Sequence, residues 1–114
     1  MSAINTRSVA AVVCSLSVAL GAYASHAAVA QDQHRLALSA TFAFAHALAL
    51  MVMADRLGAF ARAARFCLFA GIALFSGGLA AAALLGTGAM VAPAGGMLLI
   101  LGWLLAAIDY SRAP

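Results

Sequence analysis

Long apolar stretches separated by short polar segments dominate the chain. The longest runs from Phe66 to Ile108, 43 residues without a charged side chain, and a glycine- and proline-rich break lies in its middle. A single α-helix of that length would be about twice as long as the hydrocarbon core of a bilayer is thick. The stretch therefore predicts two membrane-crossing helices joined by a tight turn.

Two further apolar stretches lie upstream, and each is long enough for one crossing, which needs about 20 apolar residues. The pattern predicts an all-α protein, a bundle of four transmembrane helices that forms a single domain over residues 1–114. We expect the helices near residues 8–30, 36–54, 66–86 and 92–108.

Composition supports a membrane protein and argues against a water-soluble one. Hydrophobic residues make up 67% of the chain and charged residues 8%, whereas about a quarter of the residues in a soluble domain are charged. The net charge is +3, but the arginines flank apolar stretches and do not form a patch, so we expect no nucleic-acid partner. The expected partner is the lipid bilayer itself.

The arginines also predict how the chain is threaded. Four crossings place both termini and the middle loop on one side, and only Arg35 falls on the other side. Positively charged residues in short loops stay in the cytoplasm, so we expect a multi-pass protein of the cell inner membrane with cytoplasmic termini. The arginines on the cytoplasmic side would be Arg7, Arg56, Arg62, Arg65 and Arg112.

The first apolar stretch has an alternative interpretation. Arg7, an apolar run and the small residues of Ala22–Ala24 together resemble a signal peptide with its cleavage site. The apolar stretch continues beyond Ala24, which favours a retained first helix.

The middle loop, residues 55–65, has an amphipathic pattern. On a helical wheel its arginines Arg56, Arg62 and Arg65 lie opposite an apolar face that includes Phe60. Such a stretch can lie in the membrane interface. It can act simply as a basic loop that fixes the topology, or as a docking site for acidic lipid or a protein partner.

Small residues recur at helical spacing and predict close packing between helices. Helices in lipid associate through small residues and shared hydrogen bonds, because lipid tails are as apolar as leucine. The residues expected at these contacts are Ser17, Gly21 and Ser25 in the first helix, Gly78 in the third and Gly102 in the fourth.

His46 is the most informative polar residue within the apolar stretches. It lies about ten residues into the second predicted helix, near the midplane, where an ionisable group is costly. No carboxylate is available at that depth, so we expect a neutral ring that is hydrogen-bonded to a hydroxyl or a backbone carbonyl, with Ser76 as a candidate. The bond could simply lock the bundle; alternatively His46 could relay protons, contact a quinone or ligate haem.

Other candidate chemistry is sparse. His26, with Tyr23 one turn before it, lies near the outer end of the first helix, about 9 Å shallower than His46, and this mismatch argues against bis-histidine haem. Cys14 and Cys67 have no CxxC or CxxCH spacing, which argues against a zinc site or covalent haem. We expect no cofactor, no metal and no enzymatic activity, since no catalytic constellation is present.

Four segments, in the same order, resemble conserved segments of the domain-of-unknown-function 423 family, a family of small bacterial inner-membrane proteins that includes transmembrane protein 256. They are Gly21–His26 (GAFGAH in the family), His46–Leu50 (HALAL), Leu74–Gly78 (LFSGS) and Pro93–Gly96 followed by Gly102-Trp103 (TPxGG…GW).

The chain also departs from the family pattern. Gly78 replaces a serine and Ala92 a threonine, and Phe42 and Ala45 stand where the family usually has tyrosines. The resemblance implies a four-helix inner-membrane protein with a retained first helix. It implies no activity, since the family has no established molecular function.

Three functions remain open from the sequence, and one of them is the binding of a quinone or haem near His46 considered above. The other two need no redox group. The first is a non-enzymatic accessory or structural membrane component, associated with a larger membrane complex or with itself. The alternative is transport or conduction of a proton or small solute through an oligomer, using His46 and Ser76.

Overall fold

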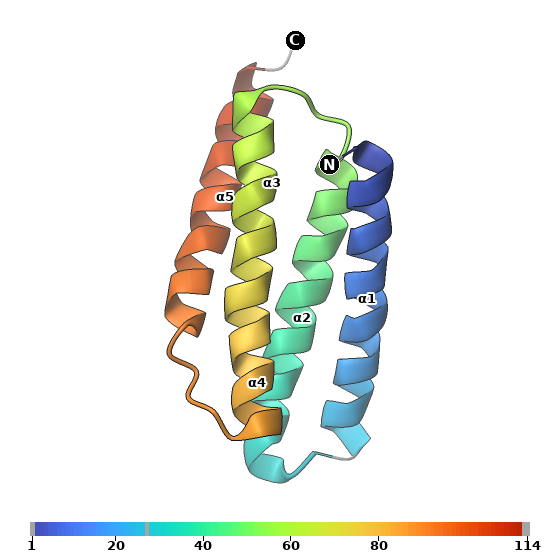
Figure 1. The fold of residues 1–114 in the computed structure, drawn as a ribbon, viewed down its shortest axis with the longest axis vertical. Coiled ribbons are helices and arrows are strands. Elements are labelled where there is room, and N and C mark those ends of the chain that lie inside the picture. The colour runs from blue at the N-terminus through green and yellow to red at the C-terminus, as the bar shows by residue number, and fades with distance from the viewer. Residues whose placement is uncertain (1, 27, 113–114) are drawn as a thin grey trace.

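Four long helices make up the fold in the computed structural model, which describes residues 2–26 and 28–112 (Figure 1). No strand occurs in these ranges, and all four helices are long and apolar enough to cross a membrane, which confirms the all-α prediction. The elements are α1 (Ala3–His26), α2 (Ala30–Met53), a third crossing built from α3 (Ala59–Gly71), the π-helical η1 (Ile72–Ser76) and α4 (Gly77–Leu85), and α5 (Ala92–Arg112).

Several helices extend beyond the bounds expected from the apolar stretches. The polar segment Gln31–Arg35, expected in a loop, forms the first turns of α2, and α3 begins at Ala59, where we expected a helix only from residue 66. Hydropathy marks only the part of a helix that lies in hydrocarbon, whereas backbone hydrogen bonding continues into the headgroup region. Asp32 in the first turn of α2 also favours a helix start, because its negative charge complements the helix dipole.

The helices follow one another side by side in an elongated molecule of 49 × 25 × 20 Å (Figure 1). Helix α1 packs on α2, α2 packs on the third crossing, and α5 packs on the other side of α3 and η1. Large apolar side chains point outward, with Val52 73% and Leu85 76% exposed. This surface suits contact with lipid tails.

The start of α1, the end of α5 and the 54–58 loop lie at the same end of the molecule, which we call the loop end (Figure 1). Two ion pairs connect them: Arg7 of α1 with Asp55, and Arg56 with Asp109 of α5. At the opposite end, Gly86 closes α4 in the left-handed conformation, with φ 69°. Pro93 then lies in the first turn of α5, where its fixed φ suits a helix start.

Candidate polar site within the membrane-spanning helices

The third crossing contains a π-helical segment at Ile72–Ser76, which the sequence did not reveal. In a π-helix each N–H donates to the carbonyl five residues earlier, and here the N–H of Gly77 donates to the carbonyl of Ile72. The carbonyl oxygen of Ser76 accepts a buried hydrogen bond of 2.7 Å from Ser39 Oγ on α2. The irregular segment is thus tied to its neighbour by a polar contact.

The hydroxyl of Ser76 itself lacks a partner. Ser76 is 4% exposed, and its Oγ makes no hydrogen bond. Among the side chains of residues 2–26 and 28–112, it is the single buried oxygen or nitrogen atom of this kind. Ser17 and Thr41 show the usual helical solution, in which the hydroxyl donates to the carbonyl four residues earlier, at 2.7 and 2.8 Å. The hydroxyl of Ser76 makes no such bond to the carbonyl of Ile72.

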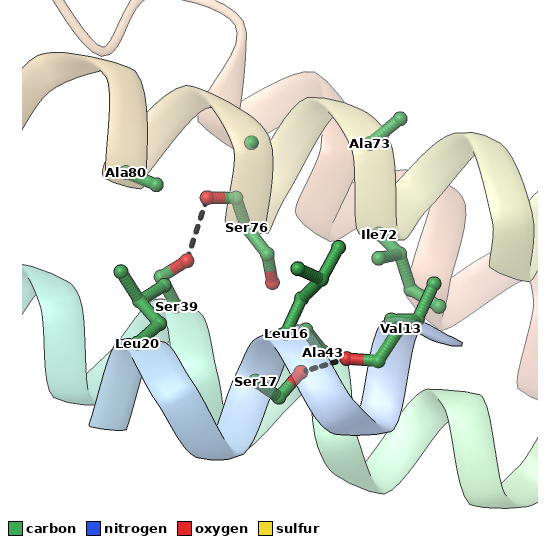
Figure 2. Close-up of a pocket in the computed structure, with 11 residues that line it drawn as sticks. Val13, Leu16, Ser17, Leu20, Ser39, Ala43, Ile72, Ala73, Ser76 and Ala80 are labelled. Carbon is green, nitrogen blue, oxygen red and sulfur yellow. Dashed lines mark hydrogen bonds between the residues drawn. The ribbon is translucent and has the colours of Figure 1, made fainter. Parts of the chain in front are cut away.

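A groove lies beside this hydroxyl, between α1, α2 and the η1–α4 segment (Figure 2). Its volume is about 280 Å³, and apart from three serines its lining is apolar. Figure 2 shows the Ser76 hydroxyl pointing across the groove toward Leu16 of α1, while the Ser76 carbonyl meets Ser39. The unpaired hydroxyl therefore lies in the wall of an apolar space, where the surrounding side chains cover it. We call this space, lined by Val13, Leu16, Ser17, Leu20, Ser39, Ala43, Ile72, Ala73, Ser76, Gly77 and Ala80, the Ser76 groove.

His46 does not pair with Ser76. Its Nδ1 lies 2.6 Å from the carbonyl oxygen of Phe42 on the same helix. A carbonyl can only accept, so Nδ1 carries the proton, and in the neutral form of the ring Nε2 then keeps its lone pair. The expected type of partner, a hydroxyl or a backbone carbonyl, is thus present as a carbonyl. The candidate partner Ser76 does not take this role, because the Phe42 carbonyl lies one turn before His46 on the same helix and is within reach.

Aromatic side chains surround His46. The residue is 8% exposed, its ring stacks on Phe42 at 5.6 Å between centroids, and it lies 6.0 Å from the ring of Trp103 on α5. Because α2 ends at Met53, His46 lies about 10 Å from the loop end of its helix. A position near the membrane midplane stays a prediction.

The other candidate polar residues lie apart from His46. Tyr23 and His26 are exposed in the last turn of α1, at the end of the molecule opposite the loop end. His34 is exposed on the first turns of α2. No group of three His, Cys, Asp or Glu side chains comes together in the described part of the chain.

Some of the small residues expected at helix contacts lie tightly against a neighbouring segment, and others have room for a larger side chain. A Cβ on Gly102 would lie 2.9 Å from Leu68 Cδ2, and one on Gly78 would lie 3.1 Å from Val91 Cγ2. Gly21 has room, since its Cβ would meet Ala40 at an ordinary 3.8 Å. Ser17 is buried, whereas Ser25 is exposed and donates to the Gly21 carbonyl of its own helix.

Two glycines that the sequence analysis missed make the closest contacts. A Cβ on Gly95 would lie 2.3 Å from the backbone nitrogen of Phe75, and one on Gly71 would lie 2.5 Å from Leu99 Cδ2. Helix α5 therefore packs directly against the backbone of η1. The available signal was the seven-residue spacing of Gly95 and Gly102, which places both on one face of α5.

The middle loop is shorter than predicted, and its amphipathic half is the start of a crossing. Helix α3 runs without interruption from Ala59 into the membrane-spanning segment, so Arg62 and Arg65 lie on its first two turns. The prediction of a loop over residues 55–65 is therefore wrong for residues 59–65, which are helical. Leu57 remains in the loop and is 88% exposed.

The arginines of the loop end have distinct contacts. Arg56 pairs with Asp109, and its guanidinium lies 3.9 Å from the ring centroid of Tyr110. Arg65 Nη1 donates to the carbonyls of Met53 and Arg56, at 2.9 and 2.8 Å, and so satisfies backbone acceptors where α2 ends. Arg62 is exposed.

Comparison with known proteins gives one match. Residues 20–96 match the family described as protein of unknown function (DUF423). The matched range covers more than half of the chain and contains His26, His46, Ser76 and Gly95. No curated protein and no solved structure matched. The π-helical segment and Gly95 thus lie within the matched range, and the chain belongs to the DUF423 family.

Proposed function

We propose that this protein is a small non-enzymatic component of the cell inner membrane that works by binding another membrane-embedded protein. The observation that carries this proposal is the unpartnered hydroxyl of Ser76, buried in the apolar Ser76 groove. A hydroxyl without a hydrogen bond in an apolar environment is unfavourable by about 1–3 kcal/mol. A transmembrane helix seated in the groove could offer a carbonyl or hydroxyl acceptor and remove that penalty.

The arrangement of the helices supports the same role. Helix α1 has α2 as its close helix neighbour within the described residues, so much of its surface is free to meet another helix. The partner helix would belong either to another subunit of a larger membrane complex or, in self-association, to a second copy of this chain.

The experiment compares Ser76→Ala with a matched control, Ser15→Ala, in protein purified from its membrane in mild detergent. Ser15 is exposed on α1 and lies outside the groove lining. We expect Ser76→Ala to lose the co-purifying component or the oligomer, while its own melting temperature stays the same or rises, because an unsatisfied hydroxyl has been removed. Equal co-purification with both variants would refute the proposal.

The proposed topology places both termini and the 54–58 loop in the cytoplasm. It is supported by the position of five of the six arginines at the loop end, according to the positive-inside rule. A reporter fused after Arg112 that is active only outside the cytoplasm should remain inactive, and an active one would contradict this topology.

One observation supports a second function, conduction of a proton or small solute through an oligomer. The bond from Nδ1 to Phe42 leaves Nε2 of His46 as a proton acceptor within a membrane-spanning helix. In liposomes, His46→Ala would then abolish a pH-dependent flux without disrupting assembly. A flux that is absent from the unmodified protein would remove this candidate.

A further inference from the structure

A second cleft lies at the loop end, between the start of α1 and the start of α3. Its volume is about 250 Å³. Two arginines, Arg62 and Arg65, form one part of the lining, and two aromatic rings, Phe66 and Phe69, form another, with Thr6 of α1 opposite. Positive charge and apolar surface thus border the same space, which we call the arginine cleft.

The charge in this cleft has no acidic counterpart among the described side chains. The chain has three acidic residues, and one of them, Asp32, lies on the first turn of α2, at the far end of the molecule. The other two are already paired, Asp55 with Arg7 and Asp109 with Arg56. Arg65 donates hydrogen bonds to two backbone carbonyls, and because carbonyls carry no net charge, they do not neutralise the charge of its guanidinium.

The position of the cleft along α3 indicates which kind of anion fits. Arg62 and Arg65 lie on the first two turns of α3, whereas Phe66 begins the 43-residue stretch without charges and is 72% exposed. The transition from charged to apolar lining therefore falls where headgroups give way to acyl chains. A phospholipid has the same order, a phosphate followed by hydrocarbon.

We propose that the arginine cleft binds one anionic phospholipid, with its phosphate between Arg62 and Arg65 and an acyl chain along Phe66 and Phe69. Guanidinium groups bind phosphate oxygens through paired, charge-assisted hydrogen bonds. A headgroup with a net negative charge is favoured over a zwitterionic one, because the ammonium of a zwitterion would meet uncompensated arginines. The site is independent of the partner helix proposed for the Ser76 groove.

The test titrates the purified full-length protein in detergent with phosphatidylglycerol or with phosphatidylcholine and counts bound lipids by native mass spectrometry. Arg62→Gln is the informative variant, since Arg62 is exposed and its loss leaves the backbone bonds of Arg65 intact. Arg35→Gln is the matched control, an exposed arginine on the first turns of α2, far from the cleft. Circular dichroism verifies that both variants keep their helices.

We expect Arg62→Gln to weaken phosphatidylglycerol binding about fivefold, the usual contribution of one basic side chain near an anionic surface. Phosphatidylcholine binding should not change, and Arg35→Gln should behave as the unmodified protein does. Equal binding of the two lipids, or equal losses in both variants, would overturn the proposal. Full displacement of the lipid by inorganic phosphate at millimolar concentration would also overturn it, since the site would then recognise a free anion.

Discussion

The substitution Gly95→Ala tests the glycine that leaves the least room for a Cβ. An added Cβ would lie 2.3 Å from the nitrogen and 2.8 Å from the Cα of Phe75, whereas ordinary contacts begin at 3.4 Å. The obstructing atoms belong to the backbone of η1, so no side-chain rotation can relieve the clash. Helix α5 and the π-helical segment would have to move apart by roughly 1 Å, which would loosen packing along the whole α5 contact.

The expected loss of stability is about 2 kcal/mol. Overpacking in a well-packed interior usually destabilises by about 1–3 kcal/mol, and a clash with backbone belongs at the upper end of that range. Alanine offsets part of this loss, because it favours the helical state over glycine by about 1 kcal/mol.

The matched control is Gly77→Ala, one residue after η1. Gly77 is helical, with φ −63°, and no atom lies within 4 Å of the Cβ it would gain. We expect this variant to be more stable than the unmodified protein by about 0.5–1 kcal/mol, since alanine reduces the freedom of the unfolded chain. The assay is unfolding in mixed micelles with increasing dodecyl sulfate, followed by circular dichroism. If Gly95→Ala proved as stable as Gly77→Ala, the close approach of α5 to η1 would be refuted.

Three further predictions concern the helix contacts and the loop end. Ser39→Ala should destabilise by about 0.6–1.7 kcal/mol in the same unfolding assay, because the Ser76 carbonyl loses a buried donor. The control Thr41→Ala removes only an exposed bond within its own helix and should be nearly neutral. Equal effects of the two substitutions would contradict the role of the Ser39 bond. Gly102→Ala should destabilise by about 1 kcal/mol or more, whereas Gly21→Ala should stabilise by about 0.5–1 kcal/mol, since of these two glycines only Gly102 lacks room for a Cβ. The reverse order would be evidence against the packing described. Asp109→Asn should lower stability by about 0.5–1 kcal/mol, because the partly exposed ion pair with Arg56 is lost. The difference in melting temperature between this variant and the unmodified protein should shrink at high salt. A difference that does not depend on salt would exclude an ionic cause.

The number and type of the membrane-spanning elements could be predicted because they depend on the absence of charge over long stretches. The bounds could not, because polar segments such as Gln31–Arg35 continue a helix once its core is formed. The helix predicted over residues 92–108 already included Gly95, but a glycine near the start of a helix does not show how closely a neighbouring helix approaches it. The structure places Gly95 of α5 directly against the backbone of Phe75.

The polar site was predictable only in part. The sequence singled out His46 and Ser76, but no local pattern marks a π-helical segment or shows that the Ser76 carbonyl would meet Ser39. His46 could bond either to a carbonyl of its own helix, as it does at Phe42, or to a group on a neighbouring helix. Helical periodicity describes each helix separately, so it does not predict which of the two bonds forms.

The π-helical segment Ile72–Ser76 means that the third crossing carries one residue more than a regular helix would need to join the same two packed faces. Elsewhere in a helix, deleting one residue rotates everything beyond it by about 100° and turns a packed face toward lipid. A deletion at the exposed Ala73 would instead be absorbed, leaving Leu68 and Ala82 facing their present neighbours. The third crossing thus has a built-in tolerance to shortening at this one place.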